Sequence, residues 1–214
     1  MVRALAARPH PGLREREGRS RASSTGYESL GDPRFRGRVC LRTSRKVYNQ
    51  SLVAMMIERL GAEVTESRVR DWVANLAAPP FADDTQLILA VAAGQCDLGL
   101  VNTYYLGRLH AEGQATEVRP FFPPAGVHVN VSGAGVTAHA PNAGQAQAFL
   151  EWLASPAVQS DFAGLNHEYP VRPGVAPSAV VAAWGEFLPE PVHVEVAGRR
   201  QAEAVALMDR AGWR

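Results

Sequence analysis

Two adjacent tyrosines, Tyr104 and Tyr105, follow a short apolar stretch at residues 97–101. A deprotonated tyrosine offers a hard, anionic oxygen, which suits a hard cation such as Fe³⁺. Because the ordinary pKa of the phenol is about 10, the bound ion itself must drive off the proton. In a turn just past a strand, two neighbouring side chains can converge on one point. From the pair alone two interpretations are open: a metal site, or amphipathic residues at the rim of the fold.

Polar residues near the pair could assist such a site. Asn102 lies two residues before Tyr104 and can orient an anion or a phenolate, or simply bond the local backbone at the strand end. Thr43 and Ser44 precede an expected helix, where they can hold an anion that accompanies a metal, or cap the helix. Residues 48–51 form a polar cluster at the same helix start and indicate no specific chemistry.

Strands and helices alternate in the first half of the chain, which predicts an α/β fold with a mainly parallel sheet. The expected elements are a strand at 37–41, a helix at 49–60 closed by Gly61, a helix carrying Trp72, a helix at 86–93 capped by Asp83 and Asp84, and a strand at 97–101. In open α/β sheets ligands bind beyond the carboxyl ends of the strands. The tyrosine pair occupies that position.

Later elements are also predicted. They are an alternating strand at 127–131, helices at 142–153 and 156–162, a loop at 169–174, and a last helix at 201–211. Residues 1–25 are rich in Arg, Pro, Gly and Ser and predict no fold, so order is expected from Tyr27. A secretory signal needs an apolar core of at least ~7 residues, and none stands near the start. Either the protein is cytosolic, or this chain begins downstream of its true start.

Composition and motifs exclude several function classes. The formal net charge of +1 argues against a dedicated nucleic-acid surface. No apolar run approaches the ~18 residues that cross a bilayer. The sequence holds no P-loop, no metalloprotease motif and no Ser-His-Asp order, so we expect a protein that is not an enzyme. His128, His139, His167 and His193 are not spaced as zinc ligands, and His128 is expected to be a hydrogen-bonded structural residue.

Cys40 and Cys96 lie on or beside two expected neighbouring strands. In an oxidising compartment they can form a disulfide, and in a reducing one they would be two buried thiols. We favour the disulfide.

Six short motifs follow one another along the chain. They are YNQSL at 48–52, AAG at 92–94, DLGLVNTYY at 97–105, HVNVSGAGVT at 128–137, EYPV at 168–171 and MDRAGW at 208–213. In this order they resemble the ferric-iron-binding periplasmic proteins of bacterial ABC importers. The resemblance runs from about Tyr27 to the C-terminus.

The resemblance implies a periplasmic-binding-protein type II lobe, an α/β fold with a mainly parallel sheet flanked by helices, plus hinge and partial N-lobe elements. The implied parts are a disordered or aberrant N-terminus (1–26), the C-terminal lobe (27–126), a hinge strand with helices returning to the first lobe (127–185), and a segment packing back on the lobe (186–214). The N-terminal lobe itself would be missing. Apolar side chains on the helices within 142–162 should then be exposed, and the isolated chain poorly soluble.

The resemblance also implies a function, in which two lobes close over Fe³⁺. Tyr104 and Tyr105 are the expected ligands, and Asn102, Thr43 and Ser44 would support the ligands or face a synergistic anion. The other ligands would come from chain preceding residue 27. The expected protein is a monomeric, periplasmic component that delivers Fe³⁺ to an inner-membrane permease. The alternatives are a binding protein for an organic anion or polyamine, and a non-functional fragment.

Overall fold

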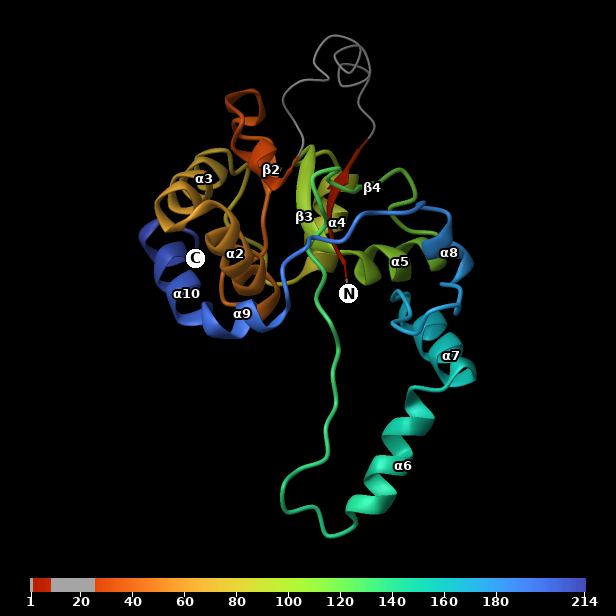
Figure 1. Cartoon of the computed structure of the whole chain (residues 1–214). Helices are drawn as coiled ribbons and strands as arrows, with labels where there is room; N and C mark the ends of the chain where they lie inside the picture. Colours follow the sequence, from red (N-terminus) through yellow and green to blue (C-terminus); the bar gives the residue numbers. More distant parts are fainter. Residues whose placement is uncertain (1, 9–25) are drawn as a thin grey trace.

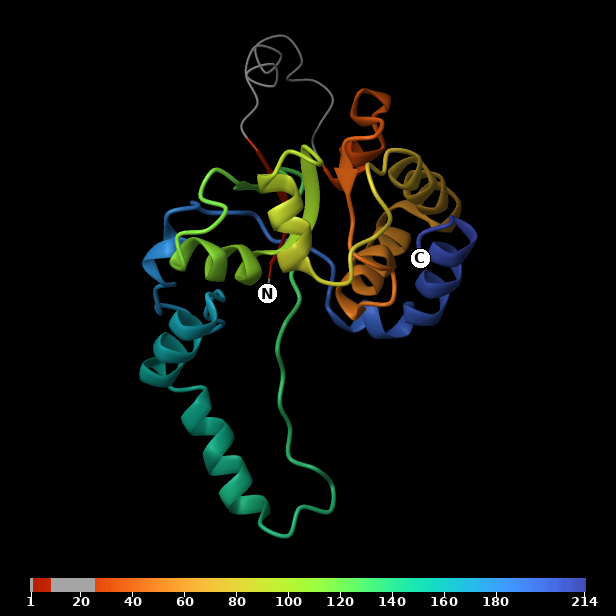
Figure 2. The same ribbon diagram turned by 180° about the vertical axis from the view of Figure 1, so that it is seen from behind.

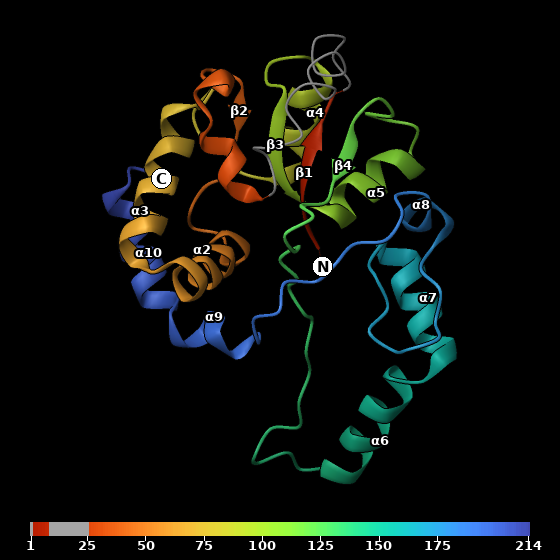
Figure 3. The same ribbon diagram turned by 45° about the horizontal axis from the view of Figure 1, so that its top comes forward.

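A four-stranded sheet lies at the centre of the computed structural model, which describes residues 2–8 and 26–214. Its strand order is β2-β3-β1-β4 (Figure 3). The strands are β1 (Arg3–Ala7), β2 (Val39–Cys40), β3 (Leu98–Asn102) and β4 (Arg119–Phe121). β2 and β3 are parallel, whereas β1 runs antiparallel to both β3 and β4.

Strand β1 corrects two predictions from the sequence. No ordered structure is predicted over residues 1–26, yet Arg3–Ala7 pairs along its whole length with β3. Because both pairs made by β1 are antiparallel, the sheet is mixed rather than mainly parallel. The sequence gives only a weak indication of this strand, because an alanine-rich segment has little strand propensity and its partner lies far along the chain. Residues 9–25, the rest of that prediction, lie outside the described residues.

Helices cover both faces of the sheet (Figures 1 and 2). Side chains alternate between the two faces along each strand, so each face presents apolar side chains that the helices bury. On one face, Leu5 and Leu100 share a core cluster with residues of three helices. These helices are α2 (Val47–Leu60), α3 (Ala62–Ala74) and α10 (Gln201–Arg210). On the other face, Ala6 and Val101 share a second cluster with residues of α4 (Asp84–Ala92) and α5 (Thr103–Ala111). Strands buried on both faces are a stable support for residues at their ends.

Short elements complete this body. They are the 3-10 helices η1 (Tyr27–Gly31) and η2 (Pro33–Phe35), and the helix α9 (Glu195–Arg199), which leads into α10. In the first core cluster, the rings of Trp72 and Trp213 meet edge to face with centroids 5.9 Å apart. This contact ties the C-terminus of the chain to α3.

The helix predictions are confirmed within a few residues, but not all of the predicted caps are. Asp83 caps α4, because its Oδ1 accepts a hydrogen bond of 2.8 Å from the Gln86 backbone N–H. Helix α2 begins at Val47, and its N-cap residue is Lys46. The predicted capping by Thr43 and Ser44 is therefore wrong. Thr43 instead accepts a local hydrogen bond from the Arg45 backbone, because the loop turns again before the helix begins.

Part of the chain after β4 projects away from this body (Figures 1 and 2). Residues 127–131, predicted as a strand, form only isolated bridges with the described residues, Val129 with Val2 and Val127 with Pro189. The helices that follow are α6 (Ala143–Leu153), α7 (Pro156–Asn166) and α8 (Ala179–Ala182). Every residue of α6 remains at least partly exposed.

The predicted exposure of apolar side chains on these helices is confirmed. Phe149 and Trp152 are each 55% exposed, and Phe162 is 51% exposed. The rings of Phe149 and Trp152 stack with centroids 5.6 Å apart. Within the parts of the chain that the structure describes, no helix combines the length and apolar character that crossing a membrane requires.

Candidate functional site

Tyr104 and Tyr105 lie in the first turn of α5, directly after strand β3. Their rings lie side by side, with centroids 4.1 Å apart and planes inclined by 31°. Both side chains are half-buried. Asn102 ends β3 and is the N-cap residue of α5. The strand-to-helix junction therefore brings the two phenols together at the carboxyl end of the strand, where the sequence predicts them.

A third tyrosine joins the pair. Tyr48 lies in the first turn of α2, and its hydroxyl is in hydrogen-bonding contact with that of Tyr104. Burial raises the pKa of Tyr104, and the hydrogen bonds with Tyr105 and Tyr48 raise it further. The phenol of Tyr104 therefore keeps its proton at neutral pH unless a cation displaces it.

Sequence reasoning missed Tyr48, because it treats the polar cluster at residues 48–51 as lacking specific chemistry. A topological signal could have found it. Tyr48 follows β2 and Tyr104 follows β3, and these two strands are parallel neighbours. The carboxyl ends of parallel strands meet at one edge of a sheet, so residues that follow them can share a site.

Arg42 brings a buried positive charge to the tyrosines. Its guanidinium carbon lies 5.8 Å from the ring centroid of Tyr48 and 5.7 Å from that of Tyr105. Its Nη1 lies 3.5 Å from Oδ1 of Asp84, and the two side chains are 6% and 0% exposed. Burial alone would lower the pKa of Arg42, but Asp84 and the Tyr105 hydroxyl outweigh burial, and the pKa lies above its ordinary value. Arg42 is thus a permanent cation beside the phenols.

Asp84 links this cation to the start of α5. Its Oδ2 accepts a hydrogen bond of 3.0 Å from the backbone N–H of Asn102. The sequence predicts Asp83 and Asp84 together as a helix cap. Only Asp83 caps the helix, while Asp84 is buried against Arg42 and the end of β3.

The three residues expected to support the site have different surroundings. The side-chain amide of Asn102 is buried, and neither its oxygen nor its nitrogen has a hydrogen-bond partner among the described residues. Ser44 lines an open groove with Gln50, Gln201 and Trp213, and no tyrosine of the described chain lines that groove. Thr43 serves the local loop through its contacts with Arg45. Of the three, only Asn102 adjoins the tyrosines and keeps free hydrogen-bonding capacity.

His128 is a buried structural residue, as the sequence predicts. Its Nε2 lies 2.9 Å from Oγ of Ser51, and its Nδ1 lies 3.4 Å from Oε2 of Glu190. Its backbone N–H donates to the Tyr27 hydroxyl over 2.9 Å. These contacts anchor the start of the projecting segment to α2 and η1.

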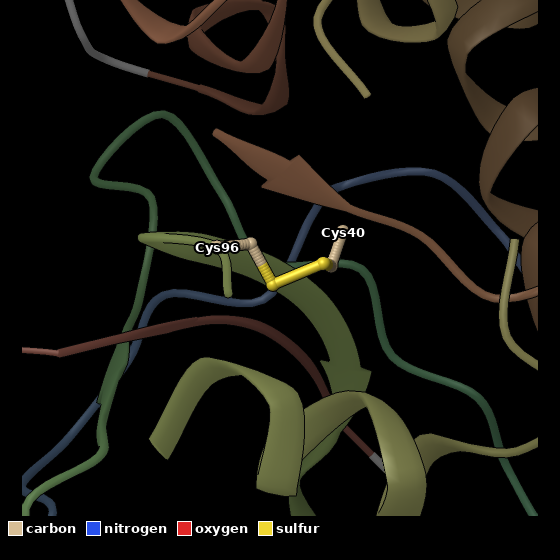
Figure 4. The surroundings of a disulfide bond; sticks show 2 residues. All are labelled: Cys40 and Cys96. Atoms are coloured by element: carbon tan, nitrogen blue, oxygen red, sulfur yellow. A yellow bond between two sulfur atoms is a disulfide. The ribbon is translucent and has the colours of Figure 1, made fainter. Parts of the chain in front are cut away.

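The predicted disulfide between Cys40 and Cys96 is confirmed (Figure 4). Their Cα atoms are 5.9 Å apart, and the two residues are 0% and 2% exposed. Cys40 is the last residue of β2, and Cys96 lies just before β3. The bond therefore joins the two strands that lead to the tyrosines.

Comparison with known families identifies the family to which this fold belongs. Residues 23–189 match the family model of the bacterial extracellular solute-binding proteins. The chain belongs to this family. Curated relatives of this solute-binding protein include iron uptake protein A1 of Synechocystis sp., which is 42% identical over 197 residues, covering 88% of this chain and 55% of the relative. The Fe(3+)-binding periplasmic protein of Serratia marcescens is 25% identical over 189 residues, covering 86% of this chain and 54% of the relative.

Solved structures agree with this assignment. The Trichodesmium protein FutA (IdiA), in complex with iron and citrate, superimposes on the solute-binding protein with a TM-score of 0.89 at 38% identity. The match covers 100% of this chain and 68% of that one. The predicted fold class, a type II periplasmic-binding-protein fold, is therefore confirmed. The chain spans about half the length of the curated relatives that it matches.

Proposed function

We propose that this chain is the iron-holding part of a periplasmic ferric-binding protein, which captures Fe³⁺ and delivers it to a membrane permease. The observation that carries the proposal is the convergence of three phenol groups, Tyr48, Tyr104 and Tyr105, from two helix starts. Three phenolates carry three negative charges, which match one ferric ion. The names of the relatives, which specify iron uptake and Fe(3+) binding, support the same cargo.

Phenolate oxygens favour the ferric over the ferrous ion, because a hard anionic donor binds the harder cation more strongly. The raised pKa of Tyr104 has a consequence for loading. Tyr104 holds its proton in the absence of a metal, so a bound ion must displace that proton, and a weakly polarising cation cannot. The tyrosine cluster is thus suited to select a small, highly charged cation.

An anion that accompanies the iron fits the same surroundings. Arg42 supplies a fixed positive charge beside Tyr105, and the buried amide of Asn102 offers a donor and an acceptor without a partner among the described residues. An oxyanion beside the iron would accept hydrogen bonds from the Arg42 guanidinium and from the Asn102 side-chain N–H groups. The Trichodesmium relative was solved with iron and citrate, which supports a carboxylate as the anion.

The compartment and partner follow from the same proposal. A buried disulfide is stable in an oxidising compartment, which favours the periplasm over the cytosol. As a solute-binding component the protein would act without catalysis and present its iron to a permease. The exposed apolar face of α6, with Phe149 and Trp152, would pack against the part of the two-lobed fold that this chain does not cover. That part would also supply the remaining iron ligands.

Visible spectroscopy tests the iron site directly. Ferric citrate added to the full chain should produce the coloured charge-transfer band of a phenolate bound to Fe³⁺. Changing Tyr104→Phe or Tyr105→Phe removes one ligand oxygen and should weaken iron binding by about tenfold or more. A wild-type protein that stays colourless at saturating ferric citrate would overturn the proposal.

Tyr169→Phe is the matched control. Tyr169 is also half-buried, but its ring packs on Phe187 in a different part of the chain, so iron binding should not change. Citrate binding that persists without iron, and that ignores the changes at Tyr104 and Tyr105, would instead favour a binding protein for an organic anion.

A further inference from the structure

The Cys40–Cys96 disulfide lies at the base of both segments that carry the tyrosines. Arg42 stands two residues after Cys40, and Tyr48 follows in the first turn of α2. Strand β3 begins two residues after Cys96 and leads directly to Tyr104. Figure 4 shows the bond spanning the gap between the two segments. Any shift between these segments would move Tyr48 relative to Tyr104.

The backbone pairing between the two segments is short. Strand β2 has only two residues, and its register with β3 consists of Val39 opposite Leu98 and Cys40 opposite Gly99. A slip of one residue between them would turn every side chain to the opposite face. Such a slip would turn Arg42 away from the phenols and from Asp84. Backbone hydrogen bonds beside this ladder, from Asp97 and Leu98 to the Arg38 carbonyl, also hold the two segments, and the disulfide adds a covalent link to them.

We propose that the Cys40–Cys96 disulfide is a positioning element of the iron site, which locks β2 against β3 and holds Tyr48 at Tyr104 before iron arrives. Its consequence for iron affinity rests on the proposed function, whereas its consequence for the tyrosine contacts does not. Both cysteines are buried, so reductants in solution reach the bond only when the fold opens. The bond is a permanent support rather than a switch.

A site that is assembled in advance binds more tightly, because less ordering is needed on binding. The test is the double variant Cys40→Ala/Cys96→Ala, made in the full chain. We expect its Fe³⁺ affinity, measured by competition with citrate, to fall about tenfold, and its visible band to broaden and shift. The variant Cys40→Val/Cys96→Ala, which refills the space of the sulfur atoms, should show the same loss.

A matched variant separates positioning from stability. Leu207 is fully buried in the cluster with α2 and α3, away from the disulfide, and Leu207→Ala should lower the Tm while leaving iron affinity and the visible band unchanged. If the disulfide variants lose stability but keep the affinity and band of the wild type, the proposal is wrong.

Two further measurements do not depend on iron. The denatured wild-type protein should show no reactive thiol, and two reactive thiols would overturn the inference. In the iron-free protein, nuclear Overhauser contacts between the rings of Tyr48 and Tyr104 should be present in the wild type and weaken in the disulfide variants. Unchanged contacts would overturn the positioning role, whereas a wild type with these contacts but no iron binding would overturn only the proposed function.

Discussion

The hydroxyl of Tyr48 is in hydrogen-bonding contact with the hydroxyl of Tyr104, although the two tyrosines begin different helices after neighbouring parallel strands. The contact has an electrostatic consequence, because burial raises the pKa of Tyr104 and the hydrogen bonds with Tyr105 and Tyr48 raise it further. Tyr104 therefore keeps its proton until a highly charged cation displaces it.

Iron binding should depend on pH. Because the pKa of Tyr104 is raised, its phenol is protonated at neutral pH and must release a proton when Fe³⁺ binds. Affinity should therefore rise with pH by about tenfold per pH unit for each proton released. Competition titrations with citrate between pH 6 and pH 8, corrected for the protonation of citrate, measure this slope. Tyr104→Phe should lower the slope by about one proton, and an affinity independent of pH would contradict the prediction.

Removing Arg42 should destabilise the fold as well as the site. In Arg42→Met the carboxylate of Asp84 stays buried but loses the cation that it faces, which we expect to cost about 3–5 kcal/mol in the free energy of unfolding. The double variant Arg42→Met/Asp84→Asn removes both charges and should recover most of that loss. Urea denaturation measures both values. Equal stability of the single variant and the wild type would show that the pair is not coupled.

Glu190 should support the fold only above acidic pH. Burial raises the pKa of Glu190, but hydrogen bonds with His128 and Arg59 outweigh burial and hold the pKa below its ordinary value of 4.5. The ionised carboxylate therefore stabilises the folded state above that value, and the contribution is lost as the pH falls through the folded-state pKa.

The variant Glu190→Gln should lower the free energy of unfolding at pH 7 by about 1–3 kcal/mol. The difference from the wild type should shrink as the pH falls below 4.5 and through the folded-state pKa of Glu190, because the wild-type carboxylate is then protonated as well. Thermal unfolding at several pH values provides the measurement. Glu186→Gln, at an exposed position nearby, is the control and should change nothing.

The projecting helices should make the isolated chain self-associate. Phe149 and Trp152 stack on each other on the exposed face of α6, and contiguous apolar patches of this kind promote association. Phe149→Ser combined with Trp152→Ser should increase the monomeric fraction in size-exclusion chromatography with light scattering. Gln145→Ser on the same helix should have no such effect. A wild-type chain that is already monomeric and monodisperse would contradict the prediction.

The sequence by itself determined the features that depend on neighbouring residues. Helical periodicity and the glycines after α2 and α4 located those helices, and Asp83 marked the start of α4. The order of short motifs determined the family resemblance, and this resemblance singled out the tyrosine pair as the candidate site. These signals are readable because helix propensity, caps and stop residues act within a few residues of each other.

Only the tertiary structure decided the features that join distant residues. It paired Arg3–Ala7 with β3, although that segment lacks a strong strand pattern of its own. It also brought Tyr48 to Tyr104, and it buried Asp84 against Arg42 where the sequence indicated a simple cap. Each contact joins residues that are far apart in the sequence, so it forms only when the whole sheet packs. Residue patterns within a few positions of each other therefore do not predict it. The phenols therefore meet because two parallel strands end at one edge of the sheet.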